Sequence, residues 1–303
     1  MSLLNLTNDG LPNILVVLYS TVAKARTPMT AMGLIEAVAP EAVVKDPRLA
    51  KTTLNRWTEL GLFKADANTG VLSLHRPPPT DMKSESEIVR AVRIEARFVA
   101  LADTNNGDLW AREEARAADL TRSLAWLLAL DVYRKGAENL FTLANDHIRE
   151  TGLTLMQNES RLTGLRSWGY FMGFIRHPKA IDIDPTLAIL DVLPDCINPG
   201  QEMPARDFIE KLAQVLPVID GGIYRQTVLG KLRDNALPAL QPSQLSTSLS
   251  RALHCLMVNQ TLHFKSPSDV GSSITLTGRD GLQTNHRYTW VTRPLRGHND
   301  RVK

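Results

Sequence analysis

The segment "DPRLAKTTLNRWTELGLFKADANTGVLSL", residues 46–74, constrains the fold more than any other part of the chain. Asp46 suits the cap position of a helix, and Pro47 suits its first turn because a proline lacks the N–H group that would have no partner there. Gly61 suits the residue just beyond the helix end. Two short apolar runs around the turn "DANTG" then predict a hairpin, with Gly70 available for a positive φ.

The helix within this segment is strongly amphipathic. At about 100° per residue, its apolar side chains fall within an arc of about 140°, which predicts the buried face. They are Leu49, Ala50, Thr53, Leu54, Trp57 and Leu60. The opposite arc carries Arg48, Lys51, Thr52, Asn55 and Glu59. One side of the helix is therefore expected in a core and the other side in solvent or against a ligand.

Two more helices are predicted ahead of this segment. "LPNILVVLYSTVA" forms the first, and its apolar residues surround the helix, so it must be covered on more than one side. "TAMGLIEAVA" forms the second, with Thr30 or Thr27 as its cap. The order helix, helix, capped helix and hairpin, from Leu11 to Leu74, resembles the winged helix-turn-helix superfamily. The helix exit "WTELGLF" and the glycine-bearing hairpin are the most telling part.

The resemblance implies that the third helix enters the major groove of DNA. Arg can bond guanine, Asn can bond adenine and Lys can neutralise phosphate. The candidate contacts are Arg48, Lys51, Thr52, Asn55 and Arg56 on the helix, with Lys64 and Asn68 on the hairpin. A solvated helix face has a similar composition, and Glu59 on this arc disfavours phosphate. The sequence leaves both interpretations open.

A second, weaker copy of the pattern is predicted from Asp184 to Gly278. "DPTLAILDVL" and "MPARDFIEKLAQVLP" supply two helices, and Pro242 and Ser243 open a third. The third helix has a buried arc of Leu245, Leu249, Ala252, Leu253 and Leu256, with Thr247, Ser250, Arg251 and His254 opposite. "TLHF" and "SITLT" predict a hairpin after it. Arg251 and Lys265 are the candidate contacts here, and this weakly basic face favours protein or light phosphate contact.

Three prolines in "HRPPPTDMK" mark a boundary because they cannot belong to a helix or a central strand. We therefore predict a mainly α chain in which two winged helix-turn-helix domains flank an all-helical middle domain. The predicted parts are a winged helix (1–76), a proline-rich linker (77–83), a helical domain (84–183), a second winged-helix-like domain (184–278) and a basic tail (279–303).

Positive charge is concentrated in that tail. The whole chain carries a net charge of +3, and residues 279–303 hold six Lys or Arg residues against two Asp. Arg287 and Arg293 alternate there with Tyr288 and Trp290. Basic residues interleaved with aromatic rings suit a nucleic-acid strand, because rings stack on bases and Arg bonds phosphate. An ordinary alternating final strand accounts for the same pattern.

No motif predicts catalysis, a cofactor or a metal site. Phosphate-binding loops, HExxH and nucleophile-elbow patterns are absent from the sequence. Cys196 and Cys255 lie far apart without a CxxC motif, which excludes a structural zinc site and argues against a disulfide framework. The aspartates of "DIDP", residues 182–185, could suggest a metal pair, but carboxylates beside a helix start are usually caps. We do not expect an enzyme.

The most apolar stretch, residues 11–23, is too short to span a bilayer. The ten residues ahead of it carry no Lys or Arg, so the basic start of a signal peptide is missing. We therefore expect a cytoplasmic protein without membrane contact.

The opening "LTNDGLPNILVVLYSTV" and the overall length are similar to the DpdG family, named from bacterial gene clusters that insert 7-deazaguanine derivatives into DNA and restrict unmodified DNA. The resemblance implies a component of a DNA modification or antiviral defence system, acting beside separate transglycosylase, helicase and nuclease subunits. It implies no particular site residues. The expected partners are DNA, other proteins of such a complex and a second copy of the chain. A DNA-binding component, a protein–protein adaptor and a transcriptional regulator all remain open.

Overall fold

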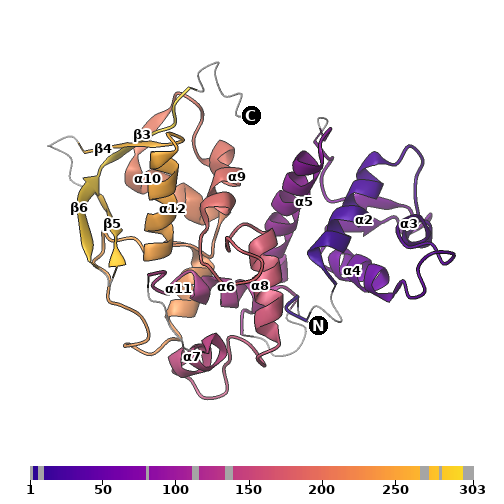
Figure 1. Cartoon of the computed structure of the whole chain (residues 1–303), viewed down its shortest axis with the longest axis horizontal. Helices are drawn as coiled ribbons and strands as arrows, with labels where there is room; N and C mark the ends of the chain where they lie inside the picture. Colours follow the sequence, from indigo (N-terminus) through magenta and orange to yellow (C-terminus); the bar gives the residue numbers. More distant parts are fainter. Residues whose placement is uncertain are drawn as a thin grey trace. The chain divides into compact units, whose positions relative to one another are not determined.

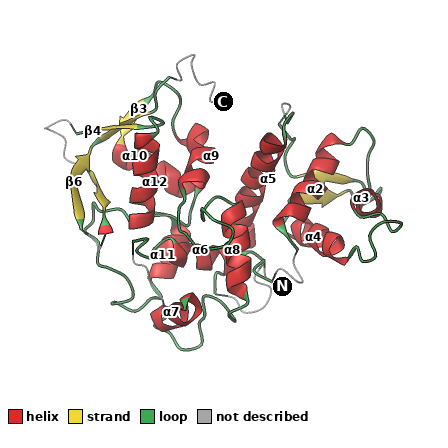
Figure 2. Ribbon diagram, viewed as in Figure 1, coloured by secondary structure: helices red, strands yellow, loops and turns green. Residues whose placement is uncertain are grey.

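The computed structural model describes residues 3–5, 10–79, 82–110, 116–133, 139–266, 273–279 and 282–295, with only the backbone described for 283–286. The chain is mainly α-helical, with a few short strands (Figure 2). It divides into two compact units, one of residues 1–121 with 156–172 and one of residues 122–155 with 173–303. Among the residues described, no helix is both long enough and apolar enough to cross a membrane.

The first unit is arranged around α2, which contacts α3, α4, α5 and the hairpin strand β2 (Figure 1). Its elements are α2 (Pro12–Lys24), α3 (Ala31–Val38), α4 (Arg48–Glu59), β1 (Phe63–Ala65), β2 (Leu72–Leu74), α5 (Glu85–Ala100), the 3-10 turn η1 (Asp103–Asn105) and α8 (Arg161–Phe171). The prediction that the first helix is covered on more than one side is confirmed.

The hairpin of the first unit gains a third partner from the chain ahead of α3. β1 and β2 pair antiparallel, and Thr30 forms an antiparallel bridge with Val71, next to β2. Thr30 also caps α3, because its hydroxyl accepts a hydrogen bond from the N–H of Gly33 at 3.2 Å. Of the two predicted caps, Thr30 is therefore the one used. The β2 side of the hairpin lies between Thr30 and β1.

Helices distant in sequence complete the core of the first unit. The rings of Trp57 on α4 and Trp168 on α8 lie 5.2 Å apart between centroids, and both are fully buried. Arg97 on α5 donates to the carbonyl of Met172, just beyond α8, at 2.8 Å. The compact units therefore do not follow the predicted division at the three prolines, because α5 and α8 belong with the first unit. The apolar stripe of α4 must be buried, and α5 and α8 help to bury it.

The second unit is built on α9, which packs against α10 and α12. Its elements are α7 (Leu140–His147), α9 (Thr186–Cys196), β3 (Glu202–Pro204), α10 (Ala205–Val215), α11 (Ile223–Leu229), α12 (Thr247–Val258), β4 (His263–Lys265), β5 (Ile274–Thr277), β6 (Gln283–Tyr288) and β7 (Trp290–Thr292). The helix α6 (Ala118–Leu127) begins in the residues of the first unit and ends in those of the second.

The predicted hairpin of "TLHF" with "SITLT" is wrong. β4 pairs instead with β7, which also pairs with β3, so the sheet has the order β3-β7-β4. β5 pairs with β6 in a separate two-stranded sheet. Val291 of β7 lies opposite both Met203 and Phe264 and is fully buried. The strand β7 thus takes the place beside β4 that β5 was expected to occupy.

The start of α12 also differs from the prediction. The helix begins at Thr247 with Ser246 as its cap, rather than at Pro242 and Ser243. Its leucine-rich arc is buried as predicted, but Thr247 and Ser250 are buried too. The hydroxyl of Thr247 donates to the carbonyl of Leu130 at 3.3 Å, and that of Ser250 accepts from the N–H of Thr277 at 2.8 Å. These partners allow the hydroxyls to be buried.

Candidate nucleic-acid interface

α4 is fixed at both ends and along one side, which determines what its other side presents. At its start, a carboxylate oxygen of Asp46 accepts a hydrogen bond from the N–H of Arg48 at 2.9 Å, with Pro47 in the cap position. Just beyond its end, Gly61 takes a φ of +93°, as its position predicted. The stripe around the buried Trp57 packs inward, so the opposite side of α4 faces solvent.

That opposite side presents three of the predicted contacts as exposed side chains: Arg48, Lys51 and Asn55. Thr52 is half-buried, and its hydroxyl donates to the carbonyl of Leu49 at 3.2 Å, so its donor is already used. The guanidinium of Arg48 lies 3.7 Å from Asp46, with the two side chains 69% and 65% exposed. An ion pair so exposed is weak, so it leaves the Arg48 guanidinium available to a ligand.

The structure does not support Arg56 as a DNA contact. Its side chain is only 4% exposed, and its Nη1 donates to a carboxylate oxygen of Glu59 at 3.1 Å. On the helix, Arg56 lies about 20° from Leu49 at the margin of the predicted buried arc, so its side chain is drawn under the surface. The same contact changes the role of Glu59. Its charge, expected to oppose phosphate, is balanced by Arg56.

The hairpin presents less positive charge than α4. Lys64 and Asn68 are exposed, as a contact with DNA requires. Between them, the carboxylate of Asp66 accepts hydrogen bonds from the backbone N–H groups of Thr69 at 2.8 Å and Asn68 at 3.0 Å. These bonds, with that of Thr69 the strongest, hold the pKa of Asp66 below its usual range. The turn therefore carries a negative charge beside Lys64.

The candidate contacts of the second unit are engaged within the chain. Arg251 on α12 donates to Asp182 at 2.9 Å and lies 4.0 Å from Asp184. Burial alone would lower the pKa of Arg251, but the two carboxylates outweigh it and raise that pKa. Lys265 on β4 pairs with Glu202 at 2.8 Å. Neither cation is placed as an open phosphate contact.

The last described strand, β7, belongs to the sheet of the second unit. Arg293 is half-buried and donates to the carbonyl of Ile197 at 2.8 Å, whereas Arg287 on β6 is exposed. The ring of Tyr288 lies 5.3 Å from that of Phe264, and burial raises its pKa. The tyrosine therefore packs as a core partner. Residues 296–303 of the predicted basic tail lie outside the described residues.

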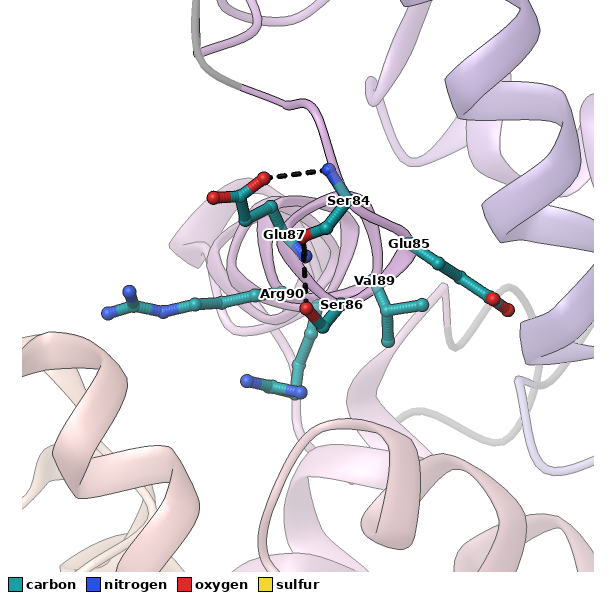
Figure 3. Close-up of a pocket in the computed structure, with 7 residues that line it drawn as sticks. Ser84, Glu85, Ser86, Glu87, Val89 and Arg90 are labelled. Carbon is teal, nitrogen blue, oxygen red and sulfur yellow. Dashed lines mark hydrogen bonds between the residues drawn. The ribbon is translucent and has the colours of Figure 1, made fainter. Parts of the chain in front are cut away.

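A broad hollow lies along the first turns of α5 (Figure 3). It is lined by Ser84, Glu85, Ser86, Glu87, Val89, Arg90 and Arg93. The carboxylate of Glu87 accepts from the N–H of Ser84 at 2.8 Å, and the hydroxyl of Ser84 accepts from the N–H of Glu87 at 3.3 Å. This is a capping box, and the first hydroxyl of the hollow is committed to starting the helix.

Among the described residues, no group of three or more His, Cys, Asp or Glu side chains could hold a metal ion. Asp184 of the "DIDP" segment accepts from the N–H of Thr186 at 3.0 Å, which confirms its expected role beside a helix start. Cys196 and Cys255 are both free thiols. Burial raises the pKa of the Cys196 thiol to about 11, so it is protonated at neutral pH.

Sequence patterns did not identify Asn105, whose side chain fixes the end of α4. The side-chain amide of Asn105, in η1, donates to the carbonyl of Leu60 and to that of Val99, both at 2.9 Å. It therefore ties the end of α4 to the end of α5. The signal in the sequence, "NNGD", indicates only a turn, because an amide bridging two distant helix ends leaves no periodic pattern.

The fold and the site define a mainly α protein whose first unit presents a polar, basic side of α4 to solvent. A family model described as DpdG-like matches residues 1–270, so the chain belongs to the DpdG-like family. This membership suggests involvement in a DpdG-type 7-deazaguanine modification system. No curated protein and no solved structure matches the chain.

Proposed function

We propose that the chain is a non-catalytic, DNA-binding component of a bacterial 7-deazaguanine DNA modification or restriction system. It contacts duplex DNA through α4 and the β1–β2 hairpin of the first unit. The observation that carries the proposal is the side of α4 opposite the buried Trp57, where Arg48, Lys51 and Asn55 are exposed. Family membership supplies the setting.

Strand order supports the proposal that both modules are winged helix-turn-helix domains. In the first, the β2 side of the hairpin lies between Thr30 and β1. In the second, β7 lies between β3 and β4. In both, a short extended segment ahead of the second helix pairs with the last strand, and that strand also pairs with the one that follows the third long helix. The second module differs by the additional helix α11 and the inserted pair β5–β6.

The placement of the side chains suggests what each would contact. Recognition helices of this kind read base edges with their N-terminal residues. Arg48 is the first residue of α4, and Asn55 lies two turns further on the same side. A bidentate Arg suits guanine and a bidentate Asn suits adenine. Lys51 lies between them, and its charge suits a phosphate.

We propose that other subunits of the system supply the chemistry. The sequence carries no phosphate-binding loop or hydrolase motif, and the hollow along α5 is lined by no histidine. A DNA-binding subunit would then position those enzymes on their substrate.

A fluorescence-anisotropy titration of duplex DNA at low salt tests the proposal. Arg48→Ala and Asn55→Ala should each weaken binding about tenfold or more, because each removes a bidentate base contact. Lys211→Ala is the matched control, since Lys211 is exposed on α10 of the second unit and should not change affinity. Duplexes with and without 7-deazaguanine should be compared. If the wild-type chain fails to bind any duplex at low salt, the proposal is wrong.

A second role, protein docking, fits the second module better than DNA contact. Arg251, Lys265 and Arg293 all have partners within the chain, so the predicted DNA contacts of this module other than Arg287 are already engaged. We propose that it holds another protein of the system, which would make the chain an adaptor as well. Co-expression with the neighbouring genes and nuclease-treated purification should then yield a stoichiometric complex. A complex that dissociates on nuclease treatment would argue against this role.

A further inference from the structure

One face of the first unit carries an apolar groove of about 270 Å³ between α2, the end of α3 and the start of α4. It is lined by Asn13, Ile14, Val17, Val38, Ala39, Val44, Asp46, Pro47, Leu49 and Ala50. Val17 is 48% exposed there, although it is part of the central helix. Exposed apolar surface beside a concave site favours association with another surface. We call this site the α2–α4 groove.

The α2–α4 groove is on a different side of α4 from the proposed DNA contacts. Leu49 and Ala50 lie about 100° and 200° around the helix from Arg48. The α4 residues of the groove therefore lie mostly away from Arg48, and the groove approaches the Arg48 guanidinium only at Asp46, 3.7 Å from it. A molecule can enter the groove whether or not the chain binds DNA.

A protruding apolar side chain lies immediately beside the groove. Val43 is 79% exposed, while the next residue, Val44, is one of the groove's walls. The turn that carries them is fixed, because the N–H groups of Val43 and Val44 donate to the carbonyl of Pro40 at 2.9 and 2.8 Å. The side chain of Val43 therefore stays in water in the isolated chain. The turn therefore presents the protruding Val43 side chain directly beside Val44, a wall of the groove.

Two oppositely charged residues flank Val43, each two positions away from it in the sequence. Glu41 precedes Val43 by two residues, and Lys45 follows it by two. Both side chains are exposed, and neither has an ion pair within the part of the chain that the structure describes. Reversing the direction of this turn exchanges the positions of the two charges. The turn is therefore complementary in charge to an antiparallel copy of itself.

We propose that the α2–α4 groove binds a second copy of this chain in a two-fold dimer. The Val43 side chain of each copy enters the groove of the other, and each Lys45 faces the other copy's Glu41. A two-fold interface uses the same patch on both subunits, so one patch must supply the protruding Val43, the α2–α4 groove and both charges. Residues 40–50 together with the start of α2 do so. A different protein would need only the groove.

Sedimentation velocity over a wide range of protein concentrations tests this proposal. The wild-type chain should shift from monomer to dimer as concentration rises. Val43→Asp should weaken the dimer at least about tenfold, because a charge would enter an apolar site. Met32→Asp is the matched control: Met32 is an 84% exposed apolar residue on α3 that does not line the groove. It should leave the dimer unchanged.

A charge exchange tests the orientation of the two copies. Glu41→Lys and Lys45→Glu should each weaken the dimer by placing like charges opposite each other, and the double variant should restore it. Because both positions are exposed, the variants should fold normally, which circular dichroism can check. A wild-type chain that is monomeric at every concentration overturns the proposal. So does an equal effect of Val43→Asp and Met32→Asp, or a groove that binds only a different protein.

Discussion

At the scale of single residues, the position of a cation around α4 decides its role. Arg48 and Arg56 share a helix and a charge, yet one is exposed and the other is 4% exposed against Glu59. The first is therefore available to a ligand, and the second holds the fold. Composition cannot separate them, because the difference is a rotation of about 80° around the helix axis.

Arg56→Ala should therefore act on stability. We expect it to lower the free energy of unfolding by about 1–3 kcal/mol, because it removes a buried, paired side chain and leaves a cavity. Lys51→Ala, on the exposed side, should change stability by less than about 0.5 kcal/mol. Urea unfolding followed by circular dichroism measures both. Equal stability of the two variants, with DNA binding lost in Arg56→Ala, would show that Arg56 reaches the ligand after all.

Glu95 on α5 gives a prediction in pH. Burial raises the pKa of Glu95, and the charges of Arg76, 3.9 Å away, and His75 only partly offset it. A carboxyl group whose pKa is higher in the folded state binds its proton more tightly there. Its stabilising effect is complete below the ordinary pKa of Glu and is lost as pH rises through the raised value.

Glu95→Gln should consequently raise the free energy of unfolding at neutral pH, and its advantage over the wild type should shrink towards about pH 4. Urea unfolding at a series of pH values measures this. Glu210→Gln controls for the loss of one negative charge, because Glu210 is exposed on α10. A Glu95→Gln variant less stable than the wild type at neutral pH would mean that the pairing with Arg76 outweighs burial.

At the scale of elements, what the sequence predicts depends on whether the signal is local. The end and the buried stripe of α4 follow from its periodicity and Gly61, whereas its start lies one residue later than predicted, with Pro47 instead of Asp46 in the cap position. The partner of β4 does not follow from the sequence, because the segments of β5 and β7 both have the apolar and polar pattern of a strand. Which of them pairs with β4 is decided by which strand the whole unit brings alongside it. The burial of Thr247 likewise depends on the carbonyl of Leu130, more than a hundred residues away. Local patterns carry no record of such partners.

The contacts of α12 give a prediction for the second module. Arg251 bonds Asp182 and lies near Asp184, whose side chain is only 3% exposed. Arg251→Ala should lower the unfolding midpoint more than Lys211→Ala does, because it removes a partner of a buried carboxylate. It should leave DNA affinity unchanged. Thermal unfolding and the anisotropy titration measure the two effects. A loss of DNA affinity without a loss of stability would mean that Arg251 contacts DNA.

At the scale of the whole molecule, the distribution of charge limits how DNA can be bound. The net charge is only +3, and the basic candidates Arg251, Lys265 and Arg293 are engaged within the second unit. Under the proposed function, phosphate contact by the candidate residues would fall chiefly on the first unit, where Lys51 and Lys64 are exposed. The chain would then hold DNA with few phosphate contacts. Its affinity should depend on salt only weakly.

The salt dependence of binding can be stated as a slope. With phosphates neutralised by Lys51 and Lys64, the logarithm of the binding constant should fall with that of the salt concentration with a slope of about −1.8. Lys51→Ala should reduce the slope to about −0.9, while Lys265→Ala should leave it unchanged because Lys265 is paired with Glu202. Anisotropy titrations at several salt concentrations measure these slopes. A wild-type slope steeper than about −5 would require many more phosphate contacts than α4 and the hairpin supply. The second unit or the end of the chain would then have to carry them, and the assignment of binding to the first unit would be wrong.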